Sequence, residues 1–433
     1  MKIKAWLKKA IFYVVLLFIM IVIFCLAMII TYALPNERIQ AHIAESKDVL
    51  TRAIGNPFFG DYIEGGQLDE FTDLIIMNTA MNKGKSEDES VFIRAFENSR
   101  YSEDGMNQYD IMIKTIENDN LYNNQGYARY WHGIQTIVRP LLLFFNYEEI
   151  RYLFMIVMFM LLTGATIMIY RNLSIWHALS FMFSMLAINF FIIPMSLQYT
   201  GIFAIMLITV ILVNLLYEKK KEKWLPYLFF IVGGCTTFFD LLTAPLITLG
   251  MPLLVDILLK NKEKCTIKES IIELVKLSIL WGISYAVVFA SKWVIASIVL
   301  QQDVITEAIN QIFFRTGGSA EYPATKLGAV WENIKYLYNT VLLLFGLLIA
   351  IIWIVMLIKK KKKITDMKTV IPLLIIAIYP YIWYSVVAGH STIHAFFTFR
   401  IQAISIFGIL SAMIECIDLQ GIKKLNGNKE IKE

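Results

Sequence analysis

Residues 10–34 read AIFYVVLLFIMIVIFCLAMIITYAL and contain no charged side chain. A transmembrane helix needs about 20 consecutive apolar residues, so this run is long enough to cross a bilayer. The core of a signal peptide is shorter, about 7–15 residues, and ends in a small-residue cleavage site. Ala33-Leu34-Pro35 is a poor site of that kind. We therefore expect an uncleaved first membrane helix over residues 10–34.

Similar apolar runs recur along the 433 residues, of which 57% are hydrophobic and only 17% charged. A soluble protein of this length carries about 25% charged residues. The runs are continuous rather than alternating, which excludes a membrane β-barrel. The predicted fold class is an all-α polytopic membrane protein with about ten transmembrane helices. The further spans are expected at 152–170, 176–193, 201–217, 226–242, 246–259, 274–299, 341–358, 370–388 and 400–419.

Lysine clusters between the runs orient the helices, because loops rich in Lys and Arg stay cytoplasmic. The amino terminus is basic, and even-numbered spans end at basic residues such as those of 219–223 and 359–363. Both termini are therefore expected in the cytoplasm. The abundance of Ile, Lys and Asn is typical of an AT-rich bacterial genome, so we expect a bacterial plasma membrane. The net charge of +5 reflects these clusters and does not indicate a nucleic-acid partner.

This topology divides the chain into six segments. They are the amino-terminal cytoplasmic segment with the first helix (1–34), a large first extracytoplasmic loop with surface or re-entrant helices (35–151), helices 2–7 (152–300), a second extracytoplasmic loop (301–340), helices 8–10 (341–419) and a basic cytoplasmic tail (420–433). In the large loop, the helical spacing of Phe71, Leu74, Ile75 and Asn78 predicts a helix over 68–81. The aromatic stretch 127–145 suits a segment at the membrane surface or re-entering it.

Ionisable residues near the outer helix ends are the candidates for function, since membrane proteins keep such groups away from lipid. The basic candidates are Arg129, Lys292, His390, His394 and Arg400. A lipid phosphate or pyrophosphate requires cations of this kind, arginine by paired hydrogen bonds and lysine as a point charge. These five residues are therefore predicted to bind a lipid phosphate.

Three acids of the large loop, Asp69, Glu70 and Asp73, are the catalytic candidates. A carboxylate above the basic set could remove a proton from an acceptor hydroxyl while the headgroup leaves. Asp69 and Glu70 could instead cap a helix.

Four further residues, Asp240, Tyr127, Trp131 and His132, are candidates for substrate binding. The aromatic ones could instead belong to an interfacial belt. His390 and His394 lack a third ligand, so no metal site is predicted, although a divalent cation remains open as a cofactor.

One amino-terminal helix, a large outer loop with Asp69-Glu70 in the run Leu-Asp-Glu-Phe, and many helices joined by short loops resemble the GT-C fold of lipid-dependent membrane glycosyltransferases. In several GT-C families an Asp or Asp-Glu of the first outer loop is the catalytic base, which implies that role for Asp69. Basic residues at outer helix ends hold the carrier phosphate in that fold, which implies that role for Lys292 and Arg400. In many members the acidic pair follows the first helix closely, whereas residues 35–68 intervene here, so Asp61 and Asp73 are alternatives.

The stretch Tyr127-Ala128-Arg129-Tyr130-Trp131-His132-Gly133 is similar to uncharacterised envelope-associated membrane proteins of Gram-positive bacteria. Together the resemblances imply a glycosyltransferase that uses a polyprenyl-phosphate-linked sugar on the outer face to modify a cell-envelope polymer or glycolipid. Its partners would be that donor, the envelope acceptor and the bilayer. A transporter or flippase, or a polysaccharide polymerase, remains an alternative. Pro252 and Pro380 within helices favour a transporter, but the sequence shows no related halves.

Overall fold

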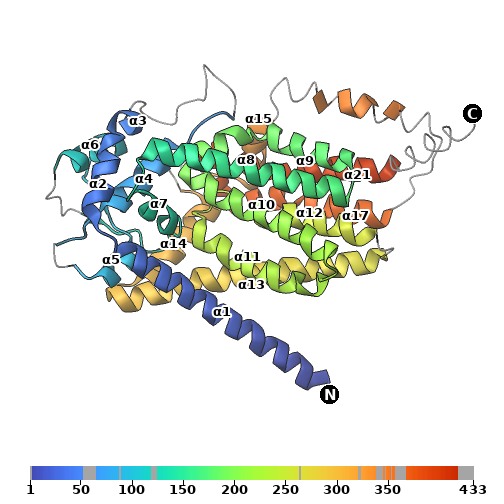
Figure 1. Cartoon of the computed structure of the whole chain (residues 1–433), viewed down its shortest axis with the longest axis horizontal. Helices are drawn as coiled ribbons and strands as arrows, with labels where there is room; N and C mark the ends of the chain where they lie inside the picture. The colour runs from blue at the N-terminus through green and yellow to red at the C-terminus, as the bar shows by residue number, and fades with distance from the viewer. Residues whose placement is uncertain are drawn as a thin grey trace, which may run out of the picture.

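The computed structural model describes residues 2–51, 65–86, 89–118, 124–262, 265–319, 323–337 and 367–417, with short pieces between 345 and 355. The regular secondary structure of this part of the chain is helical except for an isolated bridge and one short ladder, in which β1 (Arg100–Tyr101) pairs antiparallel with β2 (Asn124–Gln125). Figure 1 shows long helices lying side by side along the longest axis, with the short helices of residues 36–141 gathered at one end.

Six helical stretches of the described chain are long and apolar enough to cross a membrane. They are Leu7–Tyr32 of α1 (Lys2–Tyr32), α8 (Tyr147–Asn172), α10 (Leu197–Glu218), α13 (Ile267–Leu300), Met367–Val386 from α17 (Met367–Ala377) and α18 (Tyr379–Val386), and Ala395–Cys416 from α20 (Ala395–Thr398), η3 (Phe399–Gln402) and α21 (Ala403–Ile417). The predicted all-α multi-pass membrane protein is therefore confirmed.

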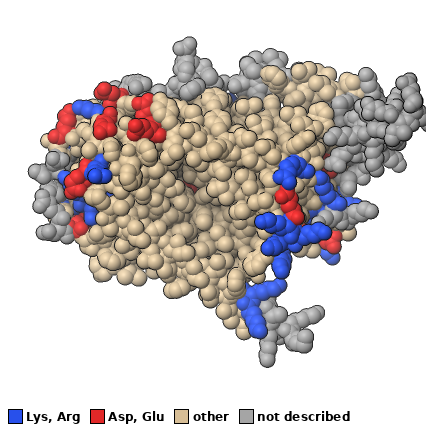
Figure 2. Space-filling view, viewed as in Figure 1, with Lys and Arg blue, Asp and Glu red and all other residues tan. Residues whose placement is uncertain are grey.

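On the face shown in Figure 2, charged residues gather at the two ends of the molecule and leave a broad uncharged surface between them. We call the end that carries the short helices of residues 36–141 the loop end. The opposite end, where Lys219, Lys220, Lys260 and Lys262 lie, is the lysine end. An uncharged belt between two charged ends is the surface that a bilayer requires, because charged side chains are costly in hydrocarbon.

Three shorter helices, α9 (Ile175–Ala187), α11 (Leu225–Phe239) and α12 (Ile247–Asn261), occupy the positions of predicted spans 3, 5 and 6. A 3-10 turn, η2 (Glu222–Trp224), leads into α11. Residues Ile247–Leu259 of α12 are all buried, so this helix packs inside the bundle. Half of the predicted span over 341–358 lies outside the described residues. The count of ten helices therefore stays a prediction.

Several predicted boundaries are wrong, and local backbone chemistry explains two of them. The third span ends at Ala187 because Asn189 adopts φ 57°, and the chain continues as η1 (Phe190–Met195). The ninth is interrupted at Ile378, before Pro380, whose missing N–H cannot continue the helical hydrogen bonds. The tenth begins at Ala395, so Arg400 lies inside it rather than opening it.

The second outer loop is also more helical than expected, with α14 (Val304–Gly317) and α15 (Lys326–Leu337). Asp303 caps α14 by accepting a hydrogen bond from the Thr306 N–H at 2.9 Å. The short helix α19 (Ala388–Ile393) packs beside both. The contacts of α19 thus link α14 to α15.

The large loop folds into α2 (Asn36–Glu45), α3 (Lys47–Thr51), α4 (Glu70–Met81), α5 (Val91–Glu97), α6 (Gln108–Glu117) and α7 (Gln135–Leu141). The predicted helix over 68–81 is α4, and it is buried from Asp73 to Met81. It shares a hydrophobic core with Ile39 and Ile43 of α2 and Val138 of α7. The loop is therefore a packed cap on the helical bundle, with α4 at its centre.

Candidate functional site

A cavity of about 250 Å³ lies at the loop end, between the cap and the ends of the long helices. Five predicted site residues line it together: Asp69, Tyr127, Arg129, His390 and His394. They come from segments more than 300 residues apart along the sequence, Asp69 from the start of α4 and His394 from the end of α19. The fold thus brings a carboxylate, cations and aromatic rings to one place.

Asp69 caps α4 with one carboxylate oxygen and keeps the other unbonded. Its Oδ1 accepts a hydrogen bond from the Thr72 N–H at 3.1 Å, as an N-cap residue does. Its Oδ2 is buried and accepts no hydrogen bond from any residue that the structure describes. Burial raises the pKa of Asp69 to about 6, against the hydrogen bonds from Thr72 and the charge of Arg400, which lower it. The Asp69 carboxyl is therefore mostly ionised at neutral pH, which lies close to this pKa.

Three arginines line the same cavity: Arg100, Arg129 and Arg315. In each of them the Nε is buried and makes no hydrogen bond within the described chain. Arg100 is held by Gln125 Oε1 at 2.9 Å, and Arg129 pairs with Glu307 Oε1 at 2.7 Å. Guanidinium groups with an unused donor near a cavity are arranged to bind an anion bidentately.

His390 positions Arg315 rather than carrying a charge itself. Burial lowers the pKa of His390 well below its usual value, and His394 and Arg315 lower it further. The neutral ring accepts from Arg315 Nη1 at Nδ1 (2.5 Å) and donates from Nε2 to the Leu242 carbonyl (2.8 Å). Burial likewise lowers the pKa of His394 to about 4, and its ring stacks on Phe397. The positive charge of the cavity therefore comes from the arginines.

Close backbone packing holds the aromatic wall of the cavity in place. The Gly133 N–H donates to the Phe238 carbonyl at 2.8 Å, and a Cβ on Gly133 would lie 2.4 Å from that oxygen. His132, with φ 55°, turns back so that its Nε2 lies 3.0 Å from the Tyr127 carbonyl. Only glycine at 133 permits this approach, so the order of residues 127–133 fixes where Tyr127 and Arg129 point.

The structure places the other predicted residues outside the cavity lining. Lys292 is fully buried, donates to the Phe96 carbonyl at 2.8 Å and lies 5.7 Å from the centre of the Trp131 ring. Trp131 is buried too and donates to the Val288 carbonyl at 2.9 Å. His132 is buried, which lowers its pKa to about 3, and Lys292 lowers it further. Lys292 and Trp131 thus join the cap to α13, whereas the hydrogen bond of His132 to the Tyr127 carbonyl stays within the cap.

Arg400 and Asp240 lie just behind the lining. Arg400 donates to the Gly65 carbonyl at 3.1 Å and lies 4.6 Å from the centre of the Tyr199 ring, and its charge lowers the pKa of Asp69. Asp240 accepts a hydrogen bond from the Thr243 N–H at 2.8 Å, and Thr243 is a lining residue. Glu70 is the first residue of α4 and does not line the cavity. Asp61 lies outside the described residues.

Asp73, the third predicted catalytic acid, is bonded on both oxygens. Its carboxylate accepts from Tyr147 Oη at 2.7 Å, from the Leu197 N–H at 3.0 Å and from Ser196 Oγ at 3.2 Å. These donors lie at the beginnings of α8 and α10. Asp73 therefore ties α4 to two long helices.

Replacing Asp73 with alanine is expected to destabilise the protein by about 2–5 kcal/mol, because buried donors lose their acceptor. Denaturant unfolding in mixed micelles would measure this loss. Asp73→Asn retains an acceptor and is expected to lose less. If Asp73→Ala kept the stability of the wild type, the hydrogen bonds of Asp73 to α8 and α10 would not stabilise the fold.

Sequence reasoning missed Arg100, Arg315, Gln198 and Thr243 as lining residues. Arg315 lies in the last turn of α14, within the segment predicted only as the second extracytoplasmic loop, and Arg100 stands in a two-residue strand. Neither residue interrupts an apolar run, so no local pattern singled them out. Gln198 donates to Thr243 Oγ1, and its buried Oε1 has no donor among the described residues. It adds a second acceptor for a ligand's hydroxyl group.

Within the described chain no group of three or more His, Cys, Asp or Glu side chains could hold a metal ion. Comparisons with protein-family models, with curated proteins and with solved structures found no match.

Proposed function

We propose that this chain is an integral-membrane glycosyltransferase that takes its sugar from a polyprenyl-phosphate carrier and transfers it to a hydroxyl of an envelope glycan or glycolipid. One observation carries the proposal: a single cavity holds three arginines with unused buried Nε donors and a carboxylate with an unbonded oxygen. A phosphate-linked sugar donor needs the first feature, and a hydroxyl acceptor needs the second. The loop end would then face the outside of the cell.

The proposed transfer assigns one role to each group. The acceptor hydroxyl attacks the anomeric carbon, its proton passes to Asp69, and the bond from that carbon to the phosphate oxygen breaks. The leaving polyprenyl phosphate takes the electron pair, and Arg100, Arg129 and Arg315 stabilise its negative charge. Asp69 suits the base role because its pKa of about 6 lies near neutral pH. His390 is a positioning residue for Arg315.

The cavity also has surfaces suited to a sugar. Tyr127 lies under Arg129, with the guanidinium carbon 4.5 Å from the ring centre. Gln198 and Thr243 supply an amide and a hydroxyl group beside Asp69 in the lining. A transporter is less well supported, because these polar groups gather at one end of the bundle rather than near its middle.

The test measures binding of a polyprenyl phosphate to the purified chain in nanodiscs. Arg315→Gln is expected to weaken binding about tenfold to a hundredfold, since a charge-assisted hydrogen bond contributes about 1.5–3 kcal/mol. Lys326→Gln is the matched control, because Lys326 is exposed and lies outside the cavity lining. The proposal fails if Arg315→Gln and Lys326→Gln bind the lipid equally well.

A further inference from the structure

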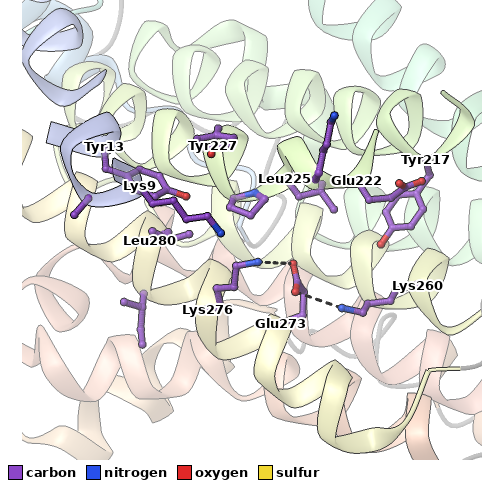
Figure 3. A pocket seen from close by; sticks show the side chains of 14 residues that line it. Lys9, Tyr13, Tyr217, Glu222, Leu225, Tyr227, Lys260, Glu273, Lys276 and Leu280 are labelled. Carbon is purple, nitrogen blue, oxygen red and sulfur yellow. Dashed lines mark hydrogen bonds and ion pairs between the residues drawn. The ribbon is translucent and has the colours of Figure 1, made fainter. Parts of the chain in front are cut away.

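A second and larger cavity, of about 970 Å³, lies at the lysine end (Figure 3). Its walls come from the amino-terminal part of α1, the end of α10, the beginning of α11, the end of α12 and the first half of α13. Ligand pockets typically enclose about 300–1,000 Å³, so the cavity can hold a whole headgroup. It is separate from the loop-end cavity and shares no lining residue with it.

The shape of this cavity follows from the course of α1. Figure 1 shows α1 running obliquely away from the bundle toward its amino terminus, which leaves a wedge between α1 and the helices behind it. The apolar part of the wedge is lined by Ala10 of α1, Leu225 of α11, and Ile279 and Leu280 of α13. An empty wedge in a bilayer would forfeit dispersion contacts along both walls, so acyl chains fill it.

The polar part of the cavity carries an excess of positive charge. Four lysines and two glutamates line it, which leaves two positive charges: Lys9, Lys223, Lys260, Lys276, Glu222 and Glu273. Glu273 is shared between Lys260 at 3.3 Å and Lys276 at 3.5 Å. Lys9 and Lys223 form no ion pair with any described residue. Figure 3 shows Lys9 and Lys276 reaching toward the same part of the cavity from α1 and α13.

Aromatic residues mark the level of this cavity in the membrane. Tyr13 of α1 and Tyr227 of α11 line it, and their rings stack at 5.4 Å with an interplanar angle of 28°. Tyrosine is enriched where lipid headgroups meet hydrocarbon, because its ring is apolar and its hydroxyl polar. The lysines beyond the tyrosines therefore lie at the level of the lipid phosphates.

We propose that this cavity binds an anionic phospholipid, with its phosphate among Lys9, Lys223 and Lys276 and its acyl chains between α1 and α13. An anion at this place offsets the repulsion between ammonium groups that α1 and α13 bring together. Basic pockets between membrane helices bind anionic headgroups in this way. The bound lipid would fix the position of α1 against the bundle, since α1 is largely exposed along its length.

Native mass spectrometry of the full chain in a non-ionic detergent tests the proposal, with phosphatidylglycerol, phosphatidylcholine or inorganic phosphate added. The wild type is expected to retain phosphatidylglycerol in preference to phosphatidylcholine. The double variant Lys9→Gln/Lys276→Gln is expected to lose about 25-fold in that preference, since each lysine near an anionic lipid contributes about fivefold. Lys219→Gln/Lys221→Gln is the matched control, because both are exposed lysines of the same end and neither lines the cavity.

Three outcomes would overturn the proposal. The wild type could retain both lipids equally, or the control double variant could lose as much preference as the cavity variant. Alternatively, inorganic phosphate could displace phosphatidylglycerol at equal concentration, which would assign the cavity to a soluble phosphate. Lys9 and Lys276 are both exposed, so their replacement is not expected to unfold the protein. Unchanged thermal unfolding of the double variant would confirm that the lipid preference itself is measured.

Discussion

Replacing Asp69 with asparagine is expected to lower transferase turnover about a hundredfold or more and to stabilise the fold. Removing a general base costs about 10²–10⁴ in rate. Asparagine is a good N-cap residue, so its side-chain oxygen can still accept from the Thr72 N–H. The arginines of the cavity are untouched, so binding of the donor lipid is expected to persist. A variant that kept full turnover would rule out Asp69 as the base.

The stability gain follows from the raised pKa of Asp69. The carboxyl has a pKa of about 6 in the folded protein against an ordinary 3.8, so the folded state holds this proton more tightly than the unfolded state. Stability is therefore lost as pH rises from about 4 through about 6. At neutral pH the loss is about 3 kcal/mol, at 1.36 kcal/mol for each unit of pKa. Asparagine cannot ionise and is expected to recover much of it.

The same pKa predicts how activity depends on pH. A general base must be ionised, so wild-type kcat/KM is expected to rise as pH increases through about 6 and then to level off. Unfolding of the wild type and of Asp69→Asn, measured on both sides of pH 6, checks the stability argument independently. Burial raises the pKa of Asp73 to about 7, and the charge of Asp69 contributes to this rise, so Asp69→Asn is also expected to lower the pKa of Asp73. The difference between the two proteins therefore contains this second contribution.

Replacing Arg139 with methionine is expected to destabilise the protein by about 3–5 kcal/mol. The guanidinium is fully buried, and its Nε donates to the Thr31 carbonyl at 3.1 Å, its Nη1 to the Ala80 carbonyl and its Nη2 to Asn36 Oδ1 at 2.7 Å. Thr31 and Ala80 lie in the last turns of α1 and α4, where helix carbonyls lack partners. One cation thus caps two helices and holds the start of a third, α2.

Loss of this side chain leaves several buried acceptors unpaired, at about 1–3 kcal/mol each. Burial lowers the pKa of Arg139 to about 10, so it stays charged at neutral pH and favours both helix carboxyl ends. Arg139→Lys keeps the charge but not the fork of donors, so an intermediate loss is expected. Arg38 is exposed on α2, and Arg38→Gln should change stability by less than about 0.5 kcal/mol.

Urea unfolding of these variants in mixed micelles would measure the order wild type, Arg139→Lys, Arg139→Met. Limited proteolysis of the cap would report the same order, because α2, α4 and α7 lose their common anchor. If Arg139→Met unfolded like Arg38→Gln, the hydrogen bonds around Arg139 would contribute nothing to stability. The cap would then depend on its hydrophobic core alone.

Only part of the candidate site could be predicted from the sequence. Asp69 and Arg129 stand out because they are charged residues of a loop between membrane helices, and both line the cavity. Lys292 stands out because it interrupts an apolar run, yet it is buried against Phe96 and Trp131. A charge in an apolar run signals that some partner exists, but it does not say whether that partner is a ligand or a backbone carbonyl.

The sequence by itself determined that this is a multi-pass helical membrane protein with a folded segment after the first helix. Long uninterrupted apolar runs belong in lipid, where the backbone must satisfy its own hydrogen bonds as a helix does. It also predicted, over 68–81, the helix that the structure shows as Glu70–Met81, since periodicity and an acidic cap are local signals. Only the tertiary structure decided which charges meet. Arg100, Arg315 and Asp69 gather in one cavity because three sets of contacts hold distant segments together. They are the close approach of Gly133 to Phe238, the hydrogen bond between Arg315 and His390, and the hydrogen bonds of Arg139. Such contacts depend on chain positions far apart, and no local pattern encodes them.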